Sequence, residues 1–324
     1  MREDLLLELE DEYSQIRSAN EREEARRLEK IRTEQPEIYR LAQERKELVF
    51  GTLRNILKGG ADAGNLPEKM EKLSAEIRQK LTENGFDADY LAPVYRCPVC
   101  KDTGRTGEPV KEPCVCLKKA YQQKLREKIG LGGDRKESFE RFDLNVFPDE
   151  KIPGQDFSQR QIMAYYRDVC EKWAGGYPNA PYRDIVLSGS TGLGKTFLLR
   201  SMAERLIERD VNVLIISAYR MLEIFRKNYF ENDGTASELL ETEVLMIDDL
   251  GSEPLMQNVT IEQLFNLINE RQNRNLATVI STNLDMAKFR ERYSERIASR
   301  LRDSRCTILS LLGKDIRIEE SRKA

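Results

Sequence analysis

Apolar residues recur at helical spacing, in a thin stripe, along the first part of the chain. Leu9, Tyr13 and Ile16 fall at positions i, i+4 and i+7, and most residues between them are charged or polar. This period predicts helices, and Pro36 predicts that residues 1–50 form two of them as a helical hairpin. Such helices either pack on their own domain with a solvated outer face or form an arm that docks a partner helix.

A third amphipathic helix is predicted where Met70, Leu73, Ile77 and Leu81 fall at helical spacing. The glycine-rich stretch 59–65 in front of it predicts a loop. The N-terminal region is therefore expected to be helical throughout its first ninety or so residues.

Short apolar runs rich in β-branched residues mark the second half of the chain. They predict buried strands at 184–188, 211–217, 243–251 and 277–283. The segments between them have helical patterns, beginning with 197–207. Strands that alternate with helices form a parallel sheet covered on both faces, so we predict an α/β fold. Glycines at 130–133 predict a linker before this fold, which starts near Ser138.

The amino-acid composition excludes several classes of protein and several kinds of functional site. Charged residues make up 34% of the 324 residues and aromatic residues only 7%, which favours long exposed helices over a compact globule throughout. The sequence has no histidine, which excludes histidine-based triads, bases and metal ligands. We find no apolar run of membrane-spanning length and no signal peptide, so we predict a cytoplasmic protein with no membrane partner.

Four of the six cysteines form two close pairs. Cys97 and Cys100 are followed, after thirteen residues, by Cys114 and Cys116. Two pairs joined by a turn-rich spacer predict a Cys₄ zinc site of the ribbon type, which is structural because four thiolates close the coordination sphere. The tighter second pair leaves reduced thiols in a small core or an iron–sulfur cluster as alternatives. The other two cysteines, at 170 and 306, lie in apolar contexts and predict buried thiols.

The segment around and after the cysteines is basic. Residues 96–136 hold eleven Lys and Arg against five Asp and Glu, whereas residues 1–47 hold ten against fourteen. Much of the basic excess falls on one predicted helix: Lys118, Lys119, Lys124, Arg126 and Lys128. This helix either has a solvated face or contacts nucleic acid or an acidic partner.

The segment 189–196 has the spacing G-x-x-x-x-G-K-T of a phosphate-binding loop, between a predicted strand and a predicted helix. A chance glycine-rich turn is the alternative. Glycines let the backbone N–H groups surround a phosphate, and the helix N-terminus adds positive potential. Lys195 is expected to contact the β- and γ-phosphates of ATP and Thr196 to bind Mg²⁺. The predicted nucleotide contacts are Gly189, Ser190, Thr191, Gly192, Leu193, Gly194, Lys195, Thr196, Phe197 and Asp248.

Carboxylates end the strand predicted at 243–251. Asp248 is placed to hold Mg²⁺, and Asp249 to orient or deprotonate the attacking water, with Glu253 as the alternative base. Farther on, Arg296 and Arg300 are spaced i, i+4 and share a helix face. Residues 286–305 hold seven Lys and Arg against three Asp and Glu. They form either a basic surface helix or one whose arginine reaches the γ-phosphate of a neighbouring subunit.

Together, the segments 189–196, 247–253, 281–284 and 295–300 resemble the AAA+ ATPases of the DnaC/DnaI helicase-loader group, with IstB-type transposition ATPases as close relatives. The resemblance covers about 139–324. It implies a parallel-sheet P-loop AAA+ core without a full helical lid, preceded by a helical and zinc-ribbon-like N-terminal region. The domains are then expected at 1–92 (helical, partner-binding), 93–133 (Cys₄ module with basic helix and linker) and 134–324 (ATPase).

The same resemblance implies roles for four catalytic residues. Asn283 matches the sensor 1 residue that positions water, and Arg317 matches the sensor 2 arginine. Arg300 matches the arginine finger, with Arg296 as second choice. Asp249 stands where most AAA+ proteins have glutamate, which implies slow hydrolysis.

The implied activity is ATP-dependent loading of a hexameric replicative DNA helicase. The N-terminal region would bind the helicase, the ATPase domain would bind single-stranded DNA, and ATP would drive self-association. Two alternatives differ in class: an IstB-like ATPase that regulates transposition, and a P-loop small-molecule kinase. The kinase lacks a visible acceptor pocket, and the transposition ATPase does not need the cysteine pairs or the acidic helical arm.

Overall fold

The computed structural model describes residues 3–57, 66–131, 137–231, 236–256 and 259–317. It divides the chain into an N-terminal unit, Leu7–Leu117, and a sheet unit, Met1–Leu6 with Lys118–Ala324. The loop predicted at 59–65 and the end of the predicted linker at 130–133 lie outside the described residues. The three-part division predicted at 1–92, 93–133 and 134–324 remains a prediction.

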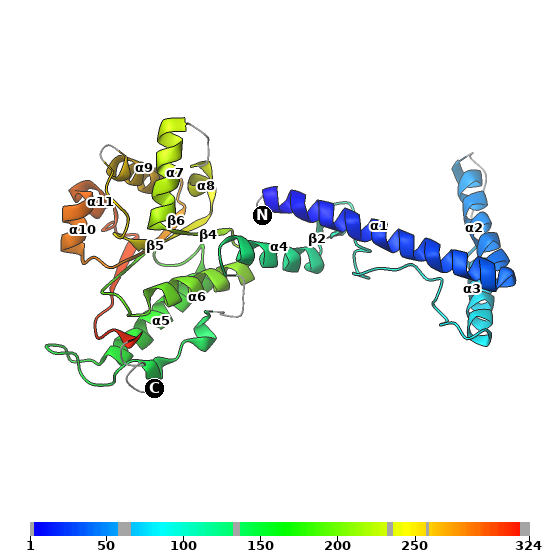
Figure 1. Cartoon of the computed structure of the whole chain (residues 1–324), viewed down its shortest axis with the longest axis horizontal. Helices are drawn as coiled ribbons and strands as arrows, with labels where there is room; N and C mark the ends of the chain where they lie inside the picture. The colour runs from blue at the N-terminus through cyan, green and yellow to red at the C-terminus, as the bar shows by residue number, and fades with distance from the viewer. Residues whose placement is uncertain (1–2, 58–65, 132–136, 232–235, 257–258, 318–324) are drawn as a thin grey trace. The chain divides into compact units, whose positions relative to one another are not determined.

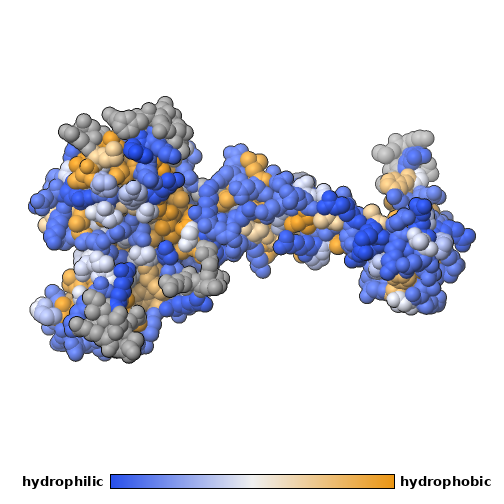
Figure 2. All heavy atoms as spheres, in the orientation of Figure 1, coloured by the Kyte–Doolittle hydropathy of each residue, from blue (hydrophilic) through white to orange (hydrophobic). Residues whose placement is uncertain are grey.

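Three helices make most of the N-terminal unit: α1 (Glu3–Glu34), α2 (Pro36–Leu57) and α3 (Leu66–Glu83) (Figure 1). Pro36 is the first residue of α2, where a proline is tolerated because the first N–H of a helix has no intrahelical partner. The three predicted helices and the break are thus confirmed, whereas the predicted hairpin of the first two is wrong: α2 packs along α3 instead. The three helices share a small core of Ile31, Ile38, Leu41, Ile77 and Leu81. Hydrophilic side chains cover most of the visible surface of α2 and α3 (Figure 2).

A two-stranded antiparallel hairpin and a helix complete the cysteine region: β1 (Arg105–Thr106), β2 (Glu112–Pro113) and α4 (Val115–Lys128). The hairpin lies between the two cysteine pairs in the sequence, as in the ribbon arrangement that their spacing predicts.

The sheet unit contains five parallel strands in the order β4-β5-β6-β3-β7, which confirms the predicted α/β class. Their bounds are β3 Asp184–Ser188, β4 Val213–Ser217, β5 Val244–Leu250, β6 Ala277–Thr282 and β7 Cys306–Ser310. The last strand was not predicted: the sequence indicated only a buried thiol at 306. Cys306 pairs with Asp184, so β7 extends the sheet beside the strand that precedes the phosphate-binding loop.

Helices cover both faces of the sheet (Figure 1). Helices α5 and α6 lie on one side, and α7 to α11 on the other. The bounds are α5 Gln159–Gly176, α6 Lys195–Glu208, α7 Ala218–Glu231, α8 Ser237–Glu241, α9 Thr260–Asn273, α10 Met286–Tyr293 and α11 Glu295–Arg300, with 3₁₀ turns η1 Phe139–Arg141 and η2 Leu144–Val146. Among the described segments, no helix combines the length and the apolar character that crossing a membrane requires.

Strand register positions the site. Ser188 at the end of β3 pairs with Thr282 at the end of β6, and Thr282 also pairs with Leu250 at the end of β5. The loops that follow these three parallel strands therefore meet at one edge of the sheet, which is where ligands bind in open α/β sheets.

Candidate nucleotide site and cysteine cluster

Glycines allow the loop after β3 to turn tightly against its neighbours. A Cβ at Gly189 would lie 2.4 Å from the carbonyl oxygen of Leu311, and one at Gly192 would lie 1.8 Å from the Asp315 carboxylate. Gly194 has φ +87° and stands immediately before α6, which begins at Lys195. The loop between strand and helix thus has the arrangement that a phosphate cradle requires.

Lys195 uses all three donors of its ammonium group, two of them within this loop. Its Nζ donates to the carbonyl oxygens of Gly189 and Ser190, both at 2.7 Å, and to Asn283 Oδ1 at 2.8 Å. Burial lowers the pKa of Lys195, and the nearby Asp249 and Asp248 carboxylates oppose that shift. A phosphate group entering the loop would compete for these donors and would add negative charge beside the buried ammonium.

Asp248 brings together hydroxyl groups from two other elements. Its Oδ1 accepts hydrogen bonds from Thr196 Oγ1 at 3.1 Å and from Ser281 Oγ at 2.5 Å. Hydroxyl and carboxylate oxygens are the ligands that Mg²⁺ prefers, so this donor set fits the ion. Ser281 had no predicted role, although its place near the end of β6 was a usable signal.

Asn283 connects the lysine to the second carboxylate. Its Oδ1 accepts from Lys195, and its Nδ2 donates to Asp249 Oδ1. Asp249 has φ +58° and its backbone N–H donates to Ser281 Oγ at 2.8 Å. The predicted sensor 1 residue and the predicted water-orienting carboxylate are therefore in direct contact.

A cavity of about 440 Å³ lies over these groups. Its lining includes the predicted Arg317 and three residues that sequence reasoning missed, Glu137, Ser281 and Ile316. The full lining is Glu137, Thr191, Gly192, Leu193, Gly194, Lys195, Thr196, Phe197, Asp248, Asp249, Ser281, Asn283, Ile316 and Arg317. Of the predicted nucleotide contacts, Gly189 and Ser190 are absent from this lining; their carbonyls hold Lys195 instead.

A smaller, largely apolar cavity of about 200 Å³ adjoins the first and shares Gly194, Phe197 and Ile316 with it. Two more aromatic rings line it: Phe142 stacks on Phe147 at 5.6 Å between centroids and meets the edge of Phe197 at 5.3 Å. A flat aromatic base such as adenine fits apolar walls of this kind.

The predicted trans arginines lie elsewhere. Arg296 and Arg300 share a face of α11, as their spacing predicted, and both guanidinium groups lie over the ring of Phe265, at 5.3 Å and 5.9 Å. Both are exposed, and neither is part of the lining of the cavity in their own chain.

Glu253, the alternative base, is not part of that lining either. It is 1% exposed, and its carboxylate accepts from the backbone N–H of Gly251 and from the hydroxyl of Tyr293. A carboxylate held in this way does not reach water in the cavity, which favours Asp249 over Glu253 as the water-orienting group.

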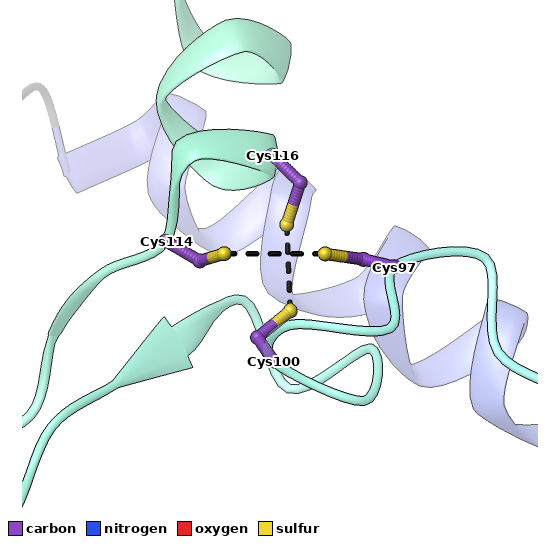
Figure 3. A group of neighbouring side chains, drawn as sticks. All are labelled: Cys97, Cys100, Cys114 and Cys116. Carbon is purple, nitrogen blue, oxygen red and sulfur yellow. Dashed lines mark hydrogen bonds between the residues drawn. The ribbon is translucent and has the colours of Figure 1, made fainter.

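The four paired cysteines converge on one point (Figure 3). Their sulfur atoms all lie within 4.8 Å of one another, with Cys97 to Cys114 at 4.0 Å and Cys100 to Cys116 at 3.4 Å. Tetrahedral zinc with Zn–S bonds of about 2.3 Å separates its sulfur ligands by about 3.8 Å. The geometry therefore fits zinc.

Helix α1 supports this cluster through Asp102, which is 1% exposed. The Asp102 carboxylate accepts from the backbone N–H groups of Arg96 and Cys97, at 2.8 Å and 2.7 Å, and from Asn20 Nδ2 at 2.8 Å. A hydrogen bond involving the Cys100 backbone lowers the pKa of Cys97 to about 7, whereas burial raises that of Cys116 to about 12. A bound cation would override these opposite pKa shifts, because it favours the thiolate form of all four cysteines.

Carboxylates within the sheet unit partner much of the basic helix α4. Arg126 Nε pairs with Glu204 at 2.8 Å, Lys118 pairs with Asp210 at 3.4 Å, and Lys128 pairs with Asp4. These contacts favour the interpretation of a helix face neutralised within its own unit over a contact to nucleic acid.

Parts of the chain are similar to known ATP-binding and helicase-loader proteins. Residues 178–324 match the family model described as IstB-like ATP binding protein. The chain is 23% identical over 245 residues to the replicative helicase loader DnaI of Bacillus subtilis (strain 168), with 68% of this chain and 76% of DnaI covered. It is 29% identical over 151 residues to the replicative helicase loader DnaC of Escherichia coli (strain K12), with 44% and 58% covered.

A crystal structure of DnaI is 26% identical, with a TM-score of 0.44, and the comparison covers 60% of this chain and 99% of that one. The match to E. coli DnaC spans less than two thirds of that protein's length.

Proposed function

We propose that this protein is an ATP-dependent loader of a replicative DNA helicase. The observation that carries the proposal is the extent of its similarity to DnaI, which covers 68% of this chain, whereas the family model covers residues 178–324 only. The similarity therefore extends beyond the ATP-binding domain that loaders share with transposition ATPases. The cysteine cluster is a second feature that a transposition ATPase does not need.

ATP would bind with its phosphates in the larger cavity and its base in the adjoining apolar one. The N–H groups of the 189–196 loop and the Lys195 ammonium would hold the phosphates, and Lys195 would exchange contacts with loop carbonyls for phosphate oxygens. Thr196 and Asp248 would hold Mg²⁺, which neutralises charge on the phosphates.

Hydrolysis would depend on Asp249 and Asn283. Because Asn283 donates to Asp249, the carboxylate is oriented and one of its oxygens stays available for the attacking water. The side chain of Arg317, which lines the same cavity, would counter charge on the transferred phosphoryl group. Arg300 would do the same for a neighbouring subunit in an ATP-dependent assembly.

The N-terminal unit would bind the helicase through the groove between its helices. It measures about 550 Å³, and apolar side chains such as Leu28, Val49 and Met70 line it beside charged ones. Phe50 belongs to the lining and is 58% exposed. An exposed aromatic residue in an apolar groove with a charged rim is typical of sites that take an amphipathic helix.

Purified protein mixed with the hexameric replicative helicase of the same organism and ATP should form a complex that light scattering detects. Phe50→Ala should weaken that complex by about 30-fold, the effect expected for an interface anchor of about 2 kcal/mol. Tyr165→Ala is the matched control, because Tyr165 is 59% exposed on α5 of the sheet unit. Absence of any complex with the wild-type protein would refute the loader proposal.

DNA binding separates the loader from the second candidate, an IstB-like ATPase that regulates transposition, which the family match favours. A loader should bind single-stranded DNA in its ATP-bound form, without sequence preference, and lose affinity as salt rises because counterions are released on binding. Preference for duplex DNA over single strands would support the transposition ATPase.

One zinc ion per chain is expected at Cys97, Cys100, Cys114 and Cys116. Elemental analysis of protein purified without chelator should find it, and Cys114→Ser should remove it, because structural zinc depends on a complete ligand set. Cys306→Ser is the control, since that thiol lies in β7. ATP affinity should not change in either variant. Finding iron with visible absorbance, or no metal at all, would contradict the assignment.

A further inference from the structure

Glu253 is the only carboxylate among the fully buried polar groups that the structure describes after β5, and it connects two elements. A buried carboxylate is costly unless donors surround it, so its partners indicate what it holds in place. One partner of the carboxylate lies on the loop after β5, and the other lies at the end of α10.

On the first side, Glu253 closes the turn that follows Asp248 and Asp249, the two carboxylates near the end of β5. The backbone N–H of Gly251 donates to Glu253 Oε2 at 2.8 Å. Within the same turn, the backbone N–H and the hydroxyl of Ser252 donate to the Asp249 carbonyl oxygen, at 3.2 Å and 2.8 Å. These bonds connect Asp249 through the turn to Gly251 and to the Glu253 carboxylate.

On the second side, Glu253 holds the corner between α10 and α11. The Tyr293 hydroxyl donates to Glu253 Oε1, and Arg292 Nη2 donates to the Glu253 carbonyl oxygen. Tyr293 is fully buried and is the last residue of α10. Ser294 follows with φ +94°, a conformation that a non-glycine residue keeps only when its surroundings impose it.

Helix α11 begins at the next residue and carries Arg296 and Arg300. We propose that Glu253 is a positioning residue: it transmits the occupancy of the nucleotide site through Tyr293 to α11, and so sets the placement of the two arginines, which do not line the cavity of their own chain. This inference rests on the proposed binding of ATP. It gives each subunit a physical connection between its own nucleotide and the arginines that it offers to a neighbour.

The network around Asp249 supplies the starting displacement. Asn283 is shared by Lys195 and Asp249, so phosphate binding that draws Lys195 away changes the partners of Asn283 and hence the restraint on Asp249. Coupling of this kind requires an element with two arrangements that the ligand distinguishes. The chain of contacts from Asp249 through Glu253 and Tyr293 to Ser294 is the candidate element.

Hydrogen–deuterium exchange on the full-length protein, with and without a non-hydrolysable ATP analogue and Mg²⁺, tests the proposal. The protein is kept at a concentration at which light scattering shows single subunits, so that assembly does not protect α11. In the wild type, nucleotide should change exchange at residues 294–301 by about fivefold or more. In Tyr293→Phe, which keeps the ring and loses only the hydroxyl, that change should disappear while analogue affinity stays within about twofold.

Tyr177→Phe is the matched control. The Tyr177 hydroxyl contacts the Glu243 carbonyl oxygen at 3.4 Å, immediately before β5 and at the opposite end of that strand. It should retain the nucleotide-dependent change at 294–301. The proposal is overturned if Tyr293→Phe also retains that change, or if the wild type binds the analogue without any change at 294–301. Failure of the wild type to bind the analogue at all would instead refute the proposed ATP binding.

Discussion

Replacing Lys195 with alanine should abolish measurable ATP binding. The Nζ group of Lys195 lies among the carbonyls of Gly189 and Ser190 and is the only ammonium group in the cavity lining that the structure describes. Charge-assisted hydrogen bonds are worth about 1.5–3 kcal/mol each, so losing two of them to phosphate oxygens lowers affinity by more than about 100-fold. Titration with a fluorescent ATP analogue measures the effect.

Lys172→Ala is the control for this variant. Lys172 lies on α5, its side chain is 74% exposed, and it pairs with Asp168 four residues earlier. Its replacement should leave ATP affinity unchanged. Circular dichroism should confirm that the Lys195 variant is folded, because the substitution also frees two loop carbonyls. A folded Lys195→Ala protein with wild-type affinity would show that the nucleotide does not bind in this loop.

The strands that we predicted from the sequence are those that contain a run of consecutive buried apolar residues. The strand ending at Ser188 and the loop after it were recognisable because glycines and Lys195 occur at a fixed spacing. The strand at Cys306–Ser310 was missed because its apolar run is only Ile308 and Leu309, and as an edge strand it fully buries only Leu309. The order of the strands could not be predicted from the sequence either. The position of β6 between β3 and β5 depends on pairing between residues that are nearly a hundred positions apart in the chain.

The chemistry of the site was predictable one residue at a time, whereas the connections between residues were not. The sequence placed Asp248 and Asp249 at a strand end, but only the fold shows that Ser281 contacts both. Glu253 and Tyr293 are forty residues apart, so their contact has no local pattern. Metal-ligand spacing, in contrast, is local within each cysteine pair, and the predicted four residues do converge.

Arg300→Ala should bind ATP almost normally and yet lose ATP-dependent assembly and the hydrolysis that assembly stimulates. The expected loss of stimulated turnover is about 10³-fold or more, the effect of removing an arginine that stabilises phosphoryl transfer in trans. The expectation rests on the proposed role of Arg300 in trans. The geometry is compatible with that role, because the guanidinium of Arg300 is exposed on α11, lies over Phe265 of α9 and does not line the cavity of its own chain. Hydrolysis rates measured against protein concentration separate stimulated from basal turnover.

Mixing two inactive variants gives the sharper test. Lys195→Ala protein cannot hold ATP but still offers Arg300, and Arg300→Ala protein holds ATP but offers no finger. At an interface between them, one complete site forms, so some stimulated hydrolysis should return in the mixture and in neither variant alone. Arg296→Ala, which alters the neighbouring position on the same helix face, serves as the comparison and identifies which of the two arginines reaches the neighbour. If Arg300→Ala protein alone fails to bind ATP, the arginine acts on the nucleotide of its own subunit, and the model of assembly through a shared site is wrong.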